Sequence, residues 1–214
     1  MSGVLEGYES GLIYLCLPIV DNLEKFVAAC IKGGVDLVQL RDKDADAKSI
    51  IAYSRLVRKV CHDLGKPFIL NDRVDLALEV EADGVHLGQD DAPIQLARRI
   101  LPKGSIVGLS THSPVELEEG NTEQVDYLSV GPIVATPTKP GRPGTTLEYL
   151  RYAGQYSQKP FFVTGGVTPE TIPQLVSLGA RGLVVVRYLT QSDHPENAAR
   201  ALRSALDASL DKLG

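Results

Sequence analysis

The chain has 214 residues, of which 43% are hydrophobic and 23% charged, and its formal net charge is −5. This composition is ordinary for a globular protein and argues against a largely disordered chain. The acidic balance argues against nucleic acid as a partner, because a nucleic-acid-binding face usually adds a basic surplus. A local cluster of cations in one cleft would still suit an anionic substrate.

The amino-terminal segment and the cysteines indicate a cytoplasmic protein. No basic region precedes the first short apolar run, as it would in a signal peptide, and no apolar stretch approaches the length of a membrane span. Cys16, Cys30 and Cys61 form no Cys-x-x-Cys pair. An odd number of cysteines without paired spacing predicts buried thiols in a reducing compartment. We therefore expect neither a membrane partner nor secretion.

Short apolar runs recur along the chain and are predicted to be β-strands. They are Leu12–Leu17, Leu37–Arg41, Pro67–Asp72, Gly84–Gln89, Ile106–Thr111, Tyr127–Ile133, Pro160–Gly166 and Gly182–Leu189. Most of these eight runs are too continuously apolar for a half-solvated strand. This pattern is typical of parallel strands that are buried on both faces.

Segments with helical periodicity separate most of these runs. They are Asp21–Gly33, Ala47–Leu64, Asp91–Leu101, Ser113–Glu119, Thr146–Tyr156, Thr168–Leu178 and His194–Leu213. The alternation of strand and helix predicts right-handed crossovers and a parallel sheet. Eight units, without a Gly-x-Gly-x-x-Gly after the first strand, favour a closed (β/α)8 TIM barrel over an open doubly wound sheet. The short connections favour a single domain spanning residues 1–214.

In a barrel of this kind, chemistry is expected at the carboxyl ends of the strands. The second strand ends in Gln39, Leu40, Arg41, Asp42 and Lys43. Because successive side chains of a strand point to opposite faces, Gln39, Arg41 and Lys43 are expected to point in the same direction. One amide and two cations suit a phosphate or diphosphate. The alternative is an ordinary solvated loop in which the cations pair with neighbouring aspartates.

Carboxylates follow the third and fourth strands. Asn71 and Asp72 end the third run, and Asp90 and Asp91 follow the fourth. Two carboxylates from adjacent strand ends can share one Mg²⁺, which usually keeps some waters and also binds substrate phosphates. Asp72 and Asp91 are the preferred pair, and Asp90 competes with Asp91. A helix N-cap is the other role open to Asp91.

Polar side chains also end the fifth strand. Ser110 is suited to hydrogen-bond a heterocycle, and His112 is either a general base or a partner of a loop carbonyl. His86, within the fourth strand, is expected to be a hydrogen-bonded core histidine.

The segment Gly131–Thr145, after the sixth strand, is long and rich in Pro, Gly and Thr. Long loops in compact barrels are usually lids or binding loops. Thr136, Pro137, Thr138 and Lys139 within it offer two hydroxyls and an ammonium for phosphate capture.

The last two strands end in groups suited to a second phosphate. The seventh ends in Thr164, Gly165 and Gly166, and the eighth in Val186 and Arg187. A glycine pair lets backbone N–H groups approach a phosphate closely, helped by the amino terminus of the following helix.

These segments, in their order and spacing, resemble the thiamine-phosphate synthase (thiamine-phosphate pyrophosphorylase) family from about Leu12 to Leu206. The matching motifs are VQLRDK, PFILNDRVDLAL, ADGVHLGQDD, VGLSTHS, DYLSVGPIVATPTKPG, GGVTPETIPQL and GARGLVVVR. The resemblance implies condensation of a hydroxymethylpyrimidine diphosphate with a thiazole phosphate, which gives thiamine monophosphate and diphosphate.

The resemblance also implies residue roles. The pyrimidine diphosphate is expected to contact Gln39, Leu40, Arg41, Asp42, Lys43, Asn71, Ser110 and Lys139, of which Arg41, Lys43, Ser110 and Lys139 are expected to act in catalysis. The thiazole phosphate is expected to contact Thr136, Pro137, Thr138, Gly166, Val186 and Arg187. Mg²⁺ is expected on Asp72 and Asp91, which by analogy favours Asp91 over Asp90.

Two departures from the family pattern concern the thiazole phosphate. Val186-Arg187 stands where many members have Ile-Ser or Val-Ser, and Thr164 replaces a small apolar residue or glycine. Two other functions remain open: a thiazole tautomerase paralogue that uses a histidine such as His112, and a non-catalytic thiamine-phosphate binder. The presence of both Asp72 and Asp91 argues against these alternatives. The sequence leaves the oligomeric state open, with a homodimer as one option.

Overall fold

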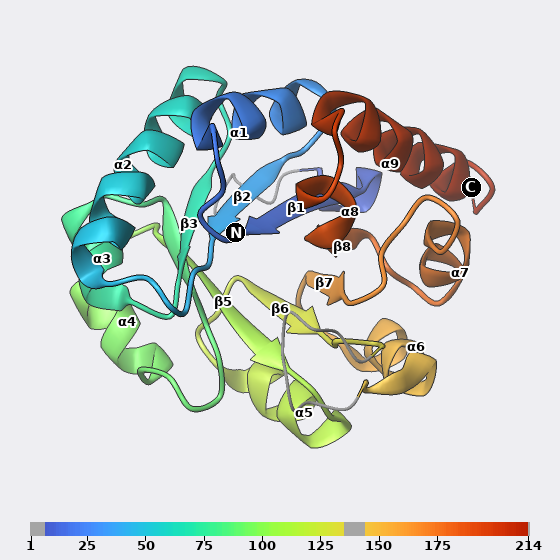
Figure 1. Cartoon of the computed structure of the whole chain (residues 1–214). Helices are drawn as coiled ribbons and strands as arrows, with labels where there is room; N and C mark the ends of the chain where they lie inside the picture. The colour runs from blue at the N-terminus through green and yellow to red at the C-terminus, as the bar shows by residue number, and fades with distance from the viewer. Residues whose placement is uncertain (1–6, 135–143, 214) are drawn as a thin grey trace.

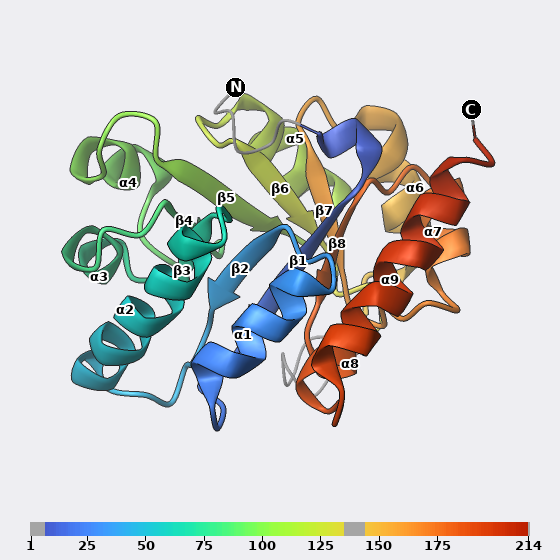
Figure 2. The ribbon, with the colours of Figure 1, turned by 90° about the horizontal axis from the view of Figure 1, so that it is seen from above.

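The computed structural model describes residues 7–134 and 144–213. Within them, eight parallel strands pair in chain order, and β8 pairs with β1 to close a barrel. Figure 1 shows these strands at the centre of the molecule, with helices around them, and Figure 2 shows the same arrangement from above. The predicted (β/α)8 TIM barrel is confirmed.

The bounds of the elements agree in most cases with the apolar and helical patterns. The strands are β1 (Leu12–Leu17), β2 (Leu37–Leu40), β3 (Phe68–Asn71), β4 (Gly84–Leu87), β5 (Ile106–Thr111), β6 (Tyr127–Val130), β7 (Phe161–Thr164) and β8 (Gly182–Val185). The helices are the 3-10 turn η2 (Tyr8–Ser10), then α1 (Leu23–Lys32), α2 (Ala47–Asp63), α3 (Val74–Glu79), α4 (Ile94–Ile100), α5 (Pro114–Thr122), α6 (Thr146–Tyr156), α7 (Ile172–Ser177), α8 (Arg187–Thr190) and α9 (Pro195–Leu210).

The strands are apolar on both faces because each face packs against a different core. In β1, Leu12 and Tyr14 belong to a cluster inside the barrel, whereas Ile13 and Leu15 belong to the larger core between strands and helices. Inside the barrel, the rings of Tyr14 and Phe162 meet edge to face, with centroids 5.3 Å apart. The continuous apolar runs are thus the signature of burial on both sides.

The helix bounds differ from the predictions at several points. The helices predicted from Asp91 and Thr168 begin only at Ile94 and Ile172. The helix α3 was not predicted, because its six residues are too few to show a clear helical period. This helix forms the connection between β3 and β4, and its buried residues include Val74 and Leu76.

The eighth strand is shorter than predicted. It ends at Val185, and the residues from Arg187 to Thr190 form α8 instead of continuing the strand to Leu189. Leu189 is fully buried in the core between strands and helices. An apolar residue buried from a short helix looks the same in sequence as one buried from a strand, and this caused the error.

The structure also bears on the membrane and cysteine predictions. Among the described residues, no helix combines the length and apolarity needed to cross a membrane. Cys16, Cys30 and Cys61 are all buried and none of them forms a disulfide, so the prediction of buried thiols is confirmed. Burial raises the pKa of Cys30 and of Cys61 to about 12, which keeps both thiols protonated and unreactive.

Candidate active site

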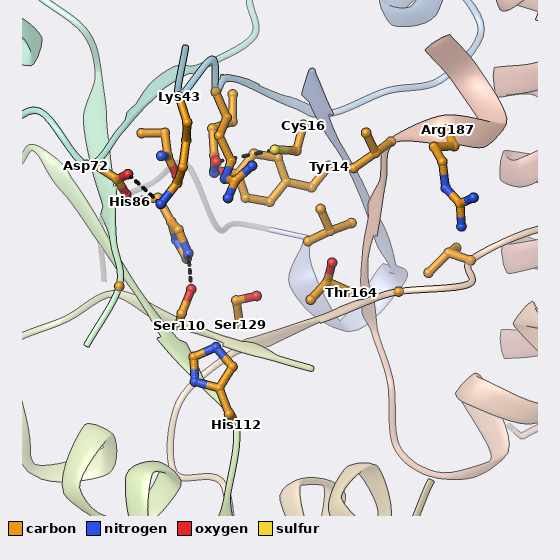
Figure 3. A pocket seen from close by; sticks show the side chains of 18 of the residues that line it. Tyr14, Cys16, Lys43, Asp72, His86, Ser110, His112, Ser129, Thr164 and Arg187 are labelled. Atoms are coloured by element: carbon orange, nitrogen blue, oxygen red, sulfur yellow. Dashed lines mark hydrogen bonds and ion pairs between the residues drawn. The ribbon is translucent and has the colours of Figure 1, made fainter. Parts of the chain in front are cut away.

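A cavity of about 400 Å³ opens at the mouth of the barrel, which we define as the carboxyl ends of its strands. Figure 3 shows side chains that enter it from several strands. It brings together most of the site residues singled out in the sequence. Those that line it include Gln39, Arg41, Lys43, Asn71, Asp72, Asp91, Ser110, His112, Gly166, Val186 and Arg187.

Alternation at the end of β2 separates two sets of side chains. Gln39, Arg41 and Lys43 line the cavity, and Gln39 is deeply buried. Leu40 instead packs in the core between strands and helices. Asp42 is bound to the surrounding backbone. Leu40 and Asp42 therefore do not line the cavity, and their expected contacts with the pyrimidine diphosphate stay a prediction.

Asp42 organises the loop that follows β2. Its Oδ2 accepts a hydrogen bond from the backbone N–H of Ile19 at 3.1 Å. Its Oδ1 accepts from the N–H groups of Asp44 and Ala45, at 3.2 and 3.1 Å. Three backbone bonds hold this loop, so Asp42 supports the neighbouring Lys43, which lines the cavity.

Asp72 follows β3, with an unusual backbone conformation and charged groups close to its carboxylate. Its φ is +60°, a left-handed conformation that aspartate tolerates better than most residues, and its N–H donates to the carbonyl of His86 at 2.8 Å. Burial and the nearby Asp91 carboxylate raise the pKa of Asp72. The Lys43 ammonium, whose Nζ lies 3.3 Å from Asp72 Oδ2, lowers that pKa in part. The site therefore favours an added cation next to Asp72.

Asp91 does not cap a helix. Its Oδ2 accepts a hydrogen bond from the N–H of Gly88 at 2.6 Å, and α4 begins at Ile94 without a side-chain cap. The N-cap alternative for Asp91 is therefore wrong. Asp90 lines the same cavity, so the geometry leaves both carboxylates near the mouth.

The donor set fits a magnesium ion that keeps part of its hydration shell. Asp72 and Asp91 repel each other and come from adjacent strand ends. Within the described residues, no group of three or more His, Cys, Asp or Glu side chains is placed to hold a metal. Mg²⁺ characteristically takes only one or two protein carboxylates and completes its shell with waters and substrate phosphates.

His86 is confirmed as a hydrogen-bonded core histidine, and it also lines the cavity. Its Nε2 lies 2.9 Å from Ser110 Oγ, and its Nδ1 lies 3.0 Å from the Tyr127 hydroxyl. Tyr14, Ser129 and other floor residues were missed by the sequence reasoning, which considered mainly the last residues of each strand. Tyr14 lies two residues before Cys16, which also lines the cavity, so the period of two could have found Tyr14 from Cys16.

His112 lies on the wall of the cavity and is held by α5. Its Nδ1 is 2.7 Å from Glu116 Oε2, and its backbone N–H donates to the same oxygen at 2.8 Å. A carboxylate on Nδ1 orients the imidazole ring. Neither of the two roles that we left open for His112 is excluded by this arrangement.

The far side of the cavity is formed by the ends of β7 and β8. Gly166 has a φ of +70°, and a Cβ at this position would lie 2.8 Å from a methyl group of Val134, so the turn requires glycine. Arg187 is the first residue of α8, and in Figure 3 it stands across the cavity from Lys43 and Asp72. Thr164 also lines this side.

Four predicted site residues cannot be placed. Thr136, Pro137, Thr138 and Lys139 lie outside the described residues. Ile133, among the described residues that precede them, lies next to β7, because its N–H donates to the Thr164 carbonyl at 2.9 Å.

Comparison with known proteins identifies the family. Residues 13–189 match the family model for thiamine monophosphate synthase. The chain is 44% identical over 201 residues to a thiamine-phosphate synthase of Nostoc punctiforme, covering 94% of this chain and 57% of the relative. A thiamine-phosphate synthase of Saccharopolyspora erythraea is 40% identical over 215 residues, covering 95% of this chain and 96% of the relative.

A solved structure gives the same result. A thiamine phosphate pyrophosphorylase from Pyrococcus furiosus superimposes with a TM-score of 0.85 and 26% identity, covering 95% of this chain and 98% of that one. The chain spans little more than half the length of several of its relatives, including the one from Nostoc punctiforme. The sequence match and the barrel mouth agree, and the chain belongs to the thiamine monophosphate synthase family.

Proposed function

We propose that this chain is a magnesium-dependent transferase that joins hydroxymethylpyrimidine diphosphate to a thiazole phosphate. The products are thiamine monophosphate and diphosphate. One observation carries the proposal beyond family membership: a single cavity combines an amide, two cations and a carboxylate pair on one side with a glycine turn and Arg187 on the other. Two phosphorylated substrates can meet in such a cavity, and each has its own anion-binding groups.

The first step is departure of diphosphate from the pyrimidine methylene. The carbon–oxygen bond breaks and both electrons leave with the diphosphate, so negative charge grows on the leaving group. Arg41 and Lys43 are placed to neutralise that charge. Asp72 and Asp91 would hold Mg²⁺, which when bound supplies further charge neutralisation for the diphosphate.

The second step forms the new bond. The lone pair of the thiazole nitrogen attacks the methylene carbon, which the electron-rich aminopyrimidine ring stabilises as a cation. This sequence needs no nucleophile from the protein. Gln39 and Ser110 would orient the pyrimidine ring from the cavity floor, where both are buried.

The second substrate is proposed to bind at the ends of β7 and β8. The backbone of Gly165 and Gly166 can approach a phosphate closely. Arg187 adds a guanidinium that can bind two phosphate oxygens at once. Where the family pattern has serine, hydroxyl and backbone groups bind the phosphate. In this chain the Arg187 guanidinium would take over part of that binding.

A direct assay tests the proposal. The protein is incubated with both substrates and Mg²⁺, and diphosphate and thiamine monophosphate are measured. We expect both products in equal amounts and neither when one substrate is omitted. Absence of product with the wild-type protein would overturn the proposal.

The pair His112–Glu116 supports a second candidate, isomerisation of the thiazole phosphate alone. A histidine oriented by a carboxylate on a cavity wall is suited to move a proton. This activity would need neither Mg²⁺ nor the pyrimidine diphosphate. Turnover of the thiazole phosphate by itself, followed by NMR, distinguishes it from the condensation.

A further inference from the structure

A continuous series of buried hydrogen bonds crosses the floor of the cavity. Gln39 Nε2 donates to the Tyr14 hydroxyl at 2.6 Å, and that oxygen lies 2.9 Å from the hydroxyl of Tyr127. Tyr127 lies 3.0 Å from His86 Nδ1, and His86 Nε2 lies 2.9 Å from Ser110 Oγ. The five side chains come from five different strands, and each is at most 7% exposed. The series links the two floor residues that we assign to the pyrimidine.

The orientation of the Gln39 amide gives this series a direction. The thiol of Cys16 donates to Gln39 Oε1 at 3.4 Å, and a thiol is a poor acceptor. The amide oxygen therefore faces Cys16 and the amide nitrogen faces Tyr14. Gln39 must donate to Tyr14, since an amide nitrogen accepts no hydrogen bond.

The following groups then fit one arrangement in which the protons of Tyr14, Tyr127 and His86 all have an acceptor within the series. Burial raises the pKa of Tyr14 and Tyr127 above the ordinary value for a phenol, so each keeps its single proton. In this arrangement Tyr14 accepts a hydrogen bond from Gln39 and donates one to Tyr127, which in turn donates one to His86 Nδ1. The reverse direction would leave the Tyr14 proton without an acceptor in the series. His86 therefore carries its own proton on Nε2 and donates it to Ser110. The Ser110 hydroxyl proton is left to point into the cavity.

The barrel makes room for this series at one glycine. A Cβ on Gly108 would overlap the ring of Tyr127 and would lie 2.6 Å from His86 Nδ1. The space allows the ring of Tyr127 to stack on His86, with centroids 5.5 Å apart and planes 19° apart. Tyr127 itself lies beneath the side chains that line the cavity, fully buried, so it reaches a substrate only through its neighbours.

We propose that Tyr127 is a positioning residue that holds His86 in its Nε2–H tautomer and thereby makes Ser110 a hydrogen-bond donor toward the substrate. A donor at this point selects a ring that presents an acceptor, such as a pyrimidine nitrogen. The identity of that ring rests on the proposed function. The direction of the hydrogen bonds rests on the contacts between these side chains and on the requirement that each buried proton has an acceptor.

The tautomer can be measured without any substrate. Nitrogen-15 NMR of imidazole-labelled protein distinguishes protonated from unprotonated ring nitrogens, and loss of signals in a His86→Asn variant assigns His86 among the four histidines. We expect a proton on Nε2 in the wild type and a mixture of tautomers in Tyr127→Phe. A wild-type proton on Nδ1, or an unchanged tautomer in Tyr127→Phe, would overturn the proposal.

Tyr14→Phe provides a second test of the same series. It removes the hydroxyl that, in the proposed arrangement, donates a hydrogen bond to Tyr127, while leaving Tyr127 and His86 in place. We expect the preference of His86 for Nε2–H to weaken in this variant also. If the preference is unchanged in Tyr14→Phe, the direction that we assign to the series is wrong.

Steady-state kinetics give a readout that a purely structural role would not produce. We expect Tyr127→Phe to raise KM for the pyrimidine diphosphate about 10-fold, as expected for one weakened hydrogen bond, and to leave KM for the thiazole phosphate unchanged. Tyr149→Phe is the matched control, because the Tyr149 hydroxyl is also buried but bonds to Thr111 Oγ1, at 2.7 Å, outside the series.

The kinetic outcomes separate the two proposals. Equal changes in both KM values, or the same change in Tyr149→Phe, would contradict the positioning role of Tyr127. Absence of thiamine monophosphate from the wild-type reaction would contradict the synthase function. In that case the NMR result still decides whether Tyr127 sets the tautomer of His86.

Discussion

The mouth of the barrel and its base, where the strands begin, use aspartate in contrasting ways. At the base, Asp36, Asp83 and Asp126 immediately precede β2, β4 and β6. Each carboxylate accepts a hydrogen bond from a backbone N–H of the preceding strand, at 2.8 to 3.0 Å. At the mouth, Asp72 and Asp91 face each other, and part of the cationic compensation is an exposed lysine.

Two of the base aspartates also form ion pairs with cationic side chains. Asp36 pairs with Arg203 of α9 and with Lys66, which lies 3.1 Å away. Asp126 pairs with Arg98 of α4 at 2.7 Å. The base carboxylates thus find partners within the protein and tie strands to helices. The mouth carboxylates repel each other, and we propose that they serve cation binding at some cost in stability.

The largest effect is expected at the mouth. Asp72→Asn keeps the size of the side chain, and asparagine tolerates the left-handed backbone. It removes one of the two carboxylates proposed for Mg²⁺, so we expect synthase activity to fall about 100-fold or more. Measurement of kcat and of the Mg²⁺ concentration for half-maximal rate checks this.

The melting temperature of Asp72→Asn supplies the control. Removal of one of two mutually repelling carboxylates should leave it unchanged or raise it. A large drop in melting temperature would show that Asp72 serves the fold as the base aspartates do. Near wild-type activity would remove Asp72 from the metal site.

The opposite pattern is expected at the base. Asp36→Asn weakens two ion pairs and the hydrogen bond from the Ile13 N–H, all of them partly buried. We expect a loss of about 2–4 kcal/mol in the free energy of unfolding, or about 5–10 °C in melting temperature. Activity per folded molecule should stay within about twofold, a ratio measured after active-site titration. A loss of kcat without a loss of stability would show that Asp36 at the base serves activity, as we propose for the aspartates at the mouth.

A smaller effect is expected for the second anion site of the mouth. Arg187→Ala should raise KM for the thiazole phosphate about 10-fold, the value for one charge-assisted hydrogen bond, while KM for the pyrimidine diphosphate stays constant. Arg200→Ala, a surface arginine on α9 paired with Glu196, is the control for loss of charge. An unchanged KM for the thiazole phosphate in Arg187→Ala would exclude Arg187 from the site.

The smallest effect is expected for a buried hydroxyl on α2. Ser54 Oγ, on the buried face of α2, is without a hydrogen-bond partner among the described residues. We expect Ser54→Ala to be neutral or to stabilise the protein by about 0.5–1 kcal/mol in urea unfolding. Ser209→Ala, which removes a hydroxyl that donates to the Ala205 carbonyl at 2.6 Å, should destabilise it instead. A clear loss of stability in Ser54→Ala would show that the hydroxyl is satisfied in solution.

The sequence pattern predicted the bounds of some elements correctly and missed others. The apolar runs of β1 and β5 matched the strand bounds because both faces of these strands are buried. The short α3 and the early end of β8 were missed, because a few buried apolar residues do not reveal which local structure buries them. Polar strand ends indicated most of the cavity lining for a related reason: parallel strands of one barrel share one carboxyl end.

The sequence by itself determined the barrel, the family and the end of the barrel where the candidate binding residues gather, because these follow from local periodicity and motif order. Only the tertiary structure decided that Asp42 serves its loop, that Asp91 is not a helix cap and that Tyr127 connects His86 to Tyr14. These facts depend on which side chains from distant strands meet inside the barrel. Hydrogen-bond partners at that distance leave no periodic trace in the chain, so only the closed sheet reveals them.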